Sequence, residues 1–131
     1  MVLLSQAVAA DPKSVQAHFE LGRVYTRMKQ YPKAIGAYTK AAELDPKFPE
    51  PLFNLGYVYQ VTMEYAKAEE MYARVVTLEP RYLDEALYNL AIVQDKQGKR
   101  QEAIGNLERA VRVNPANKPA ERFLNSLKRK Q

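Results

Sequence analysis

The stretch LGRVYTRMKQYPKAIGAYTKAAELDP, residues 21–46, decides the fold, because its pattern occurs three times in the chain. Seven positions return 34 residues later, and they return again, with some changes of residue type, after a shift of 35 residues. A fixed period in the thirties indicates one supersecondary unit stacked on copies of itself. The recurring positions are Leu21, Gly22, Tyr25, Ala34, Tyr38, Ala41 and Pro46, then Leu55, Gly56, Tyr59, Ala68, Tyr72, Val75 and Pro80, then Leu90, Ala91, Gln94, Ala103, Leu107, Ala110 and Pro115.

Each copy predicts two helices. The first helix has apolar residues at i, i+3, i+4 and i+7 starting from Leu21, which is the spacing of one helical face. The second helices are predicted at about residues 32–44, 66–78 and 100–113, and each ends before a proline, because the residue before proline disfavours the helical conformation. Gln94 stands where the other copies have tyrosine, so looser packing is predicted at that position.

The spacing Leu-Gly-x-x-Tyr, Ala-x-x-x-Tyr-x-x-Ala and Pro resembles the tetratricopeptide repeat family over nearly the whole chain. The resemblance implies an all-α fold, a right-handed superhelical solenoid of antiparallel helix pairs with a C-terminal capping helix. It implies one domain over residues 1–131. The implied divisions are a trailing half-repeat at 1–14, repeats at 15–48, 49–83 and 84–117, and a cap helix at 118–131.

Composition and charge limit the classes of function. The chain has 131 residues, of which 47% are hydrophobic and 27% are charged, as in a globular domain. It has no cysteine, and none of its apolar runs approaches the roughly 20 residues that cross a bilayer. The net charge of +5 comes mainly from residues 15–48 and 118–131. This distribution favours a solvated exterior over a continuous nucleic-acid-binding surface.

The first twelve residues allow two interpretations. The stretch Ala7 to Ala10 is similar to a signal-peptide cleavage region, but the basic start of such a signal is missing. Pro12 lies 34 residues before Pro46, so residues 1–10 match the end of a second helix. We therefore favour a piece of a longer protein over a chain that begins with an unpaired helix. The compartment is not identified, with the cytoplasm slightly favoured.

The sequence predicts no enzyme, no cofactor and no metal site. His18 is the single histidine, and a packing role is favoured because metal binding and acid–base catalysis need partner residues. Gly22 and Gly56 lie inside predicted helices, where close helix contact explains them better than phosphate binding. The carboxylate pairs of the chain are interpreted as solvent-facing.

A peptide-binding groove is predicted on the other side of each first helix, which in this family lines the concave surface. An aromatic residue recurs at Phe19, Phe53 and Tyr88, and an asparagine recurs at Asn54 and Asn89. An aromatic ring can anchor a peptide and an amide can pair with its backbone, although both can also serve only to pack neighbouring repeats. The predicted groove residues are Phe19, Glu20, Arg23, Arg27, Phe53, Asn54, Tyr57, Gln60, Tyr88, Asn89, Ile92 and Lys96.

These residues predict a non-catalytic protein–protein interaction scaffold that holds a peptide or partner helix. The family's chaperone-tail binders carry a carboxylate clamp, of which only Asn54 is present here, and Glu85 would repel a terminal carboxylate. A ligand of mixed charge with an apolar centre is predicted instead. The alternative is self-association through residues 1–12, where Leu3, Leu4 and Val8 lack a cover within the chain. Nucleic-acid binding through Arg122 and residues 128–130 is the least favoured option.

Overall fold

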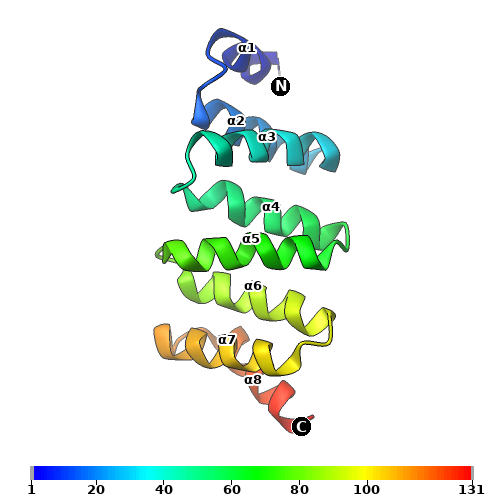
Figure 1. Ribbon diagram of the computed structural model, residues 1–131, viewed down its shortest axis with the longest axis vertical. Helices are drawn as coiled ribbons and strands as arrows, with labels where there is room; N and C mark the ends of the chain where they lie inside the picture. The colour runs from blue at the N-terminus through cyan, green and yellow to red at the C-terminus, as the bar shows by residue number, and fades with distance from the viewer. Residues whose placement is uncertain (1, 131) are drawn as a thin grey trace.

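The computed structural model describes residues 2–130, and within that range the chain folds into eight α-helices stacked in chain order along one axis (Figure 1). The two ends of the stack carry the two ends of the chain (Figure 1). The helices are α1 Val2–Ala10, α2 Val15–Arg27, α3 Tyr31–Leu44, α4 Pro49–Val61, α5 Tyr65–Leu78, α6 Leu83–Lys96, α7 Arg100–Val113 and α8 Lys118–Arg129. Neighbours along the chain are neighbours in space, so the predicted all-α array of helix pairs is confirmed.

Each helix pair is closed by a turn with one residue in the left-handed conformation. These residues are Lys29, Met63 and Gly98, with φ of 58°, 63° and 80°. They occupy the same place in the α2–α3, α4–α5 and α6–α7 turns. Only the third turn uses glycine, which adopts this conformation without the Cβ clash that other residues suffer.

The loops between successive pairs begin with an acidic or amide residue before a proline. At Asp11, Asp45 and Asn114 the side-chain oxygen accepts a hydrogen bond from the backbone N–H two residues later, at 3.1, 3.2 and 3.1 Å. Glu79 makes no such bond within the described chain and has a φ of 48°. The loops 45–48 and 79–82 are equally long, so the extra residue of the 35-residue period lies in α6, which has 14 residues where α2 and α4 have 13.

The core between repeats is built from small residues and one large ring or leucine. Tyr38 and Tyr72 are each 1% exposed, and Leu107 is fully buried in the equivalent place. A Cβ atom at Gly22 or Gly56 would lie 2.6 Å from a ring carbon of Tyr38 or Tyr72. These two glycines are therefore required by the close approach of the tyrosine rings.

Gln94 is more closely packed than its sequence predicts. Its side chain is 5% exposed, its Nε2 donates to Glu69 Oε2 at 3.2 Å, and its Oε1 accepts from Asn106 at 2.8 Å. The tyrosines at the equivalent positions, Tyr25 and Tyr59, are only half-buried. The prediction of looser packing was wrong, because hydrogen bonds to two neighbouring helices take the place of ring contacts.

The two ends of the stack differ in burial. In α8, Ala120, Leu124 and Leu127 are buried as the end of the core, whereas α1 buries none of its residues. His18 is 8% exposed and its Nε2 lies 2.8 Å from the Pro12 carbonyl, so its predicted packing role is confirmed. Across residues 2–130, each helix is too short or too polar to cross a bilayer.

Candidate functional site: a groove face with two cavities

The face formed by α2, α4 and α6 opposite the core, here called the groove face, contains two cavities. Asn54 and Asn89 occupy the same register position in successive repeats, and each lines one of them. The N-terminal cavity has a volume of about 320 Å³ and is lined by Arg23, Thr26, Arg27, Tyr38, Asn54 and Tyr57. The C-terminal cavity has a volume of about 500 Å³ and is lined by Asp84, Glu85, Tyr88, Asn89, Asn114, Asn117 and Pro119.

The N-terminal cavity is lined by residues of α2 and α4 and by Tyr38 of α3. The Tyr38 hydroxyl is hydrogen-bonded to Thr26 Oγ1 at 3.2 Å and accepts from Asn54 Nδ2 at 3.4 Å. Tyr57 is 51% exposed beside it. Arg23 and Arg27 give the cavity its positive charge, although Arg23 also pairs with Glu20 at 3.2 Å.

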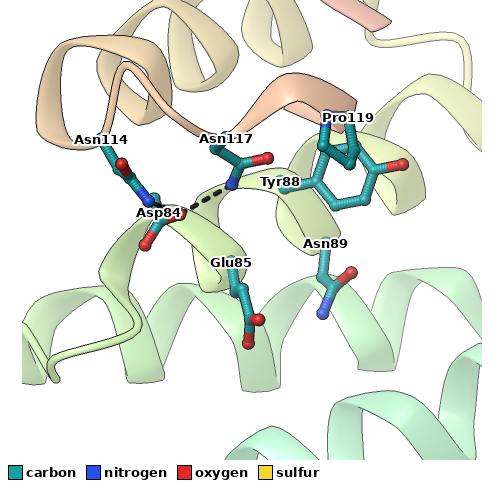
Figure 2. Close-up of a pocket in the computed structure, with 7 residues that line it drawn as sticks. All are labelled: Asp84, Glu85, Tyr88, Asn89, Asn114, Asn117 and Pro119. Carbon is teal, nitrogen blue, oxygen red and sulfur yellow. Dashed lines mark hydrogen bonds between the residues drawn. The ribbon is translucent and has the colours of Figure 1, made fainter. Parts of the chain in front are cut away.

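The C-terminal cavity is organised by Asp84, whose side chain is drawn with its neighbours in Figure 2. Asp84 is 8% exposed, and its Oδ2 accepts from Asn114 Nδ2 at 3.0 Å and from Asn117 Nδ2 at 2.7 Å. The Oδ1 of Asn117 accepts from the Ala120 N–H at 3.1 Å and caps α8. The start of α6 is thereby tied to the loop before α8, and both amides are held in fixed orientations.

Glu85 and Asn89 form the outer part of the same cavity. They lie one turn apart on α6 and extend to the same side of the helix (Figure 2). Glu85 is exposed, and Asn89 is half-buried. The cavity therefore presents carboxylate and amide oxygens, with the Tyr88 ring as an apolar surface.

Two tyrosine hydroxyls position side chains next to the groove face. Burial raises the pKa of Tyr72, whose hydroxyl stays protonated and donates to Gln60 Oε1 at 2.9 Å. Burial and the hydrogen bond to Glu50 raise the pKa of Tyr82, which donates to Glu50 Oε1 at 2.8 Å. Both groups remain neutral donors at physiological pH, so both contacts are structural.

Comparison with known protein families shows which family this arrangement belongs to. A TPR repeat profile matches residues 22–61, and two tetratricopeptide repeat profiles match residues 49–116 and 3–36. The chain belongs to the tetratricopeptide repeat family. TPR domains typically serve as protein–protein interaction modules and are generally non-catalytic scaffolds. No curated protein sequence matched the chain.

Solved structures resemble this TPR domain over most of its length. The crystal structure of MamA is 24% identical with a TM-score of 0.87, covering 95% of this chain and 72% of MamA. YrrB, described as a TPR protein with an unusual peptide-binding site, is 21% identical with a TM-score of 0.83, covering 95% of this chain and 63% of its own. The first TPR of Spaghetti (RPAP3), bound to the HSP90 peptide SRMEEVD, is 26% identical with a TM-score of 0.82, covering 92% and 94%.

The recurring aromatic residues of this TPR domain pack against other rings. Phe19 is 9% exposed, and its ring centroid lies 5.3 Å from that of Phe48 in the next loop. Phe53 lies 5.2 Å from Tyr82, and Tyr88 lies 6.2 Å from Phe123. Each ring thus joins one repeat to the next, and Tyr88 alone among the three also lines a cavity.

The other predicted groove residues divide into those that line a cavity and those that do not. Four of them meet in the N-terminal cavity, namely Arg23, Arg27, Asn54 and Tyr57, and Asn89 joins Tyr88 in the C-terminal cavity. The remainder, Glu20, Gln60, Ile92 and Lys96, line neither cavity. Gln60 is engaged by Tyr72, Glu20 accepts from Gln16 and Arg23, Ile92 is half-buried, and Lys96 is exposed.

Sequence reasoning did not place several cavity residues on the groove face. Asp84, Asn114 and Asn117 come from the start of one helix and from a loop 30 residues later, and only the packing of α7 against α6 and α8 brings them together. Asn117 carried one signal, because an asparagine directly before Lys118 and Pro119 is a typical helix N-cap. That signal predicts the cap and not the contact with Asp84.

Proposed function

We propose that this TPR domain binds a peptide segment or partner helix on its groove face and catalyses no reaction on it. The observation that carries the proposal is the recurrence of one asparagine, Asn54 and then Asn89, at the same register position, each in the wall of a cavity on this face. A repeated amide suits a ligand that is itself a repeating chain, because each amide offers a donor and an acceptor to a peptide unit.

The exposed side chains of the face support the same proposal. Tyr57 is 51% exposed beside the N-terminal cavity, so its ring is available as an anchor. Asn89 makes no side-chain hydrogen bond within residues 2–130. A rigid aromatic side chain next to polar groups with free hydrogen-bonding capacity is a frequent arrangement at peptide-binding surfaces.

The ligand differs from a chaperone tail in this proposal. The first TPR of Spaghetti (RPAP3) holds the acidic peptide SRMEEVD. Here the carboxylates of Asp84 and Glu85 line the C-terminal cavity, and neither lysine nor arginine lines it. An acidic C-terminus at this end would bring like charges together, which disfavours binding.

A selection of random dodecapeptides displayed on phage tests the proposal. We expect the wild-type domain to enrich a common motif, and we expect Tyr57→Ala combined with Asn89→Ala to weaken the selected peptides at least about tenfold, as loss of an anchor residue does. Val113→Ala is the matched control, because Val113 is 47% exposed at the end of α7 and lines neither cavity. A selection without enrichment, or equal binding by the double variant, would contradict the proposal.

A second candidate function is self-association through α1. Val2 and Leu3 are 70% and 80% exposed on a helix that buries none of its residues. Exposed apolar side chains of this kind commonly mark contact surfaces. Multi-angle light scattering over a hundredfold concentration range would show a dimer for the wild type and a monomer for Leu3→Glu. A monomeric wild type throughout rules this candidate out.

A further inference from the structure

The two cavities of the groove face carry opposite charge. Arg23 and Arg27 line the N-terminal cavity without an acidic neighbour in its wall, and Asp84 and Glu85 line the C-terminal cavity without a basic one. Arg23 is partly neutralised by Glu20 at 3.2 Å, whereas Arg27 is in no ion pair within the described chain. The groove face is therefore positive at one end and negative at the other.

The acceptor groups of the C-terminal cavity favour a cation. Asp84 uses Oδ2 for its two amide partners, and its Oδ1 accepts no hydrogen bond from the residues that the structure describes. Glu85 is exposed and forms no ion pair within that same range. A lysine ammonium or an arginine guanidinium carries only donors, so either group matches these oxygens. Asp84 is nine-tenths buried, so solvent screens its charge less than that of a surface carboxylate.

The Tyr88 ring gives the C-terminal cavity an apolar wall. The hydrocarbon stem of a lysine or arginine can lie along such a ring while its charged end reaches the carboxylates. A volume of about 500 Å³ leaves room for a long side chain of this kind. The cavity thus has the shape and the chemistry to receive a basic side chain.

We propose that the ligand of the groove face places a lysine or arginine in the C-terminal cavity and an aspartate or glutamate at the N-terminal cavity. This inference rests on the proposed peptide-binding function and adds to it the charge order of the ligand, and hence its direction along the domain. Complementary charge at the two ends selects one direction, because the reversed ligand meets like charge at both.

The helix spacing sets the distance between the two charges of the ligand. The N-terminal cavity is lined by the first helices of repeats one and two, and the C-terminal cavity by the first helix of repeat three and the start of α8, so two repeat-to-repeat steps separate them. At roughly 10 Å for each step, the separation is on the order of 20 Å. An extended peptide covers that distance in about six residues.

The phage selection described above also tests this inference, with charge-reversal variants added. Wild-type peptides should show a basic and an acidic position about six residues apart. Glu85→Lys should weaken them about tenfold and should select peptides with an acidic residue at the formerly basic position. Glu70→Lys is the matched control, because Glu70 is exposed on α5 and lines neither cavity; a change below about twofold is expected.

A synthetic peptide pair completes the experiment. One peptide has the selected sequence, and the other has its acidic and basic residues exchanged, with binding followed by fluorescence anisotropy and folding of each variant checked by circular dichroism. The exchanged peptide should bind wild type at least about tenfold more weakly. Peptides that depend on Tyr57 and Asn89 but show no charge order, or that tolerate the exchange, overturn this inference and leave the proposed function standing. A selection without groove-dependent peptides overturns both.

Discussion

The third repeat fills the space between its two helices with different residues from those of the first two repeats. In the first two, the rings of Tyr38 and Tyr72 lie against Gly22 and Gly56, where an added Cβ would come within 2.6 Å of a ring carbon. In the third, the smaller Leu107 is buried in place of the ring, and Ala91 stands where the glycine was. The comparison shows that the helix pair tolerates either a large residue against glycine or a smaller one against alanine, because what is conserved between repeats is the filled volume.

The junction between the second and third repeats differs in its polar contacts as well. Glu69 on α5 accepts hydrogen bonds from Gln94, Gln97 and Lys99 at 3.2, 2.9 and 2.9 Å. Isoleucine occupies the place of Glu69 in α3 and in α7. At this junction, therefore, a hydrogen-bonded network supplements the apolar contacts that hold the other helices together. Substitutions at these positions measure how much each difference contributes to the free energy of unfolding.

The largest effect is expected from removal of a buried ring. Tyr72→Ala should lower the free energy of unfolding by about 3–5 kcal/mol, because it leaves a cavity and removes the donor to Gln60. Urea denaturation followed by circular dichroism measures the change. Tyr57→Ala, at an exposed tyrosine, should cost less than about 0.5 kcal/mol. Similar losses for the two variants would contradict the role given to the buried ring.

A smaller effect is expected from a methyl group added beneath that ring. Gly56→Ala should cost about 1–3 kcal/mol, because its Cβ would meet the Tyr72 ring at 2.6 Å. The double variant Gly56→Ala/Tyr72→Leu copies the Ala91–Leu107 pair of the third repeat. It should lose less stability than the sum of the two single variants, by at least about 1 kcal/mol. Strict additivity would show that the two positions do not share one packed volume.

The polar junction predicts a pH-dependent difference. Burial alone would raise the pKa of Glu69, but hydrogen bonds from Lys99, Gln94 and Gln97 and the charge of Lys99 hold it below its ordinary value of 4.5. Because the pKa is lowered in the folded state, the charged carboxylate stabilises the fold above pH 4.5, and this stabilisation is lost as pH falls through the folded-state pKa.

Glu69→Gln should therefore cost about 1–2 kcal/mol at pH 7, and the difference from wild type should shrink below pH 4.5. Urea denaturation at a series of pH values measures it. The exposed neighbour Glu70→Gln controls for the loss of one carboxylate and should differ little from wild type throughout. A deficit of Glu69→Gln that stays constant down to pH 3 would refute the network as its source.

The smallest effect concerns the turns within the helix pairs. Lys29 and Met63 adopt the left-handed conformation that Gly98 adopts in the third repeat. Lys29→Gly should raise the free energy of unfolding by about 0.5–1 kcal/mol by relieving backbone strain, and Gly98→Ala should lower it by about 1 kcal/mol. Thermal melts of both variants measure the shifts. A loss of stability in Lys29→Gly would mean that the lysine side chain contributes more than its backbone costs.

Much of the fold was predictable because it depends on local spacing. The second helices were predicted at 32–44, 66–78 and 100–113, and they begin within one residue of those positions and end where predicted. The small residues between repeats could be identified in the same way, because they recur at fixed positions of the repeat. The apolar period and the positions of the prolines are likewise local signals. Gln94 was misjudged, because its partners Glu69 and Asn106 lie on other helices.

The candidate site was less predictable than the fold. Arg23, Asn54 and Asn89 were placed on the groove face by their register, and the structure finds them in cavity walls. The aromatic residues could not be assigned in advance to ligand binding or to packing. A ring at this register position can turn toward a ligand on the groove face or toward the next repeat. Phe19 and Phe53 contact rings of neighbouring elements, and those contacts depend on how the pairs stack.

The sequence by itself determined the repeat, the bounds of the second helices and the family, because periodicity and proline placement act over a few turns of helix. Only the tertiary structure decided which side chains meet across repeats. Asp84 joins Asn114 and Asn117 over 30 or more residues of chain, and these contacts form one side of the C-terminal cavity. The physical reason is that a helix period specifies which face a residue occupies, whereas the residues it meets there are set by the packing of neighbouring helices.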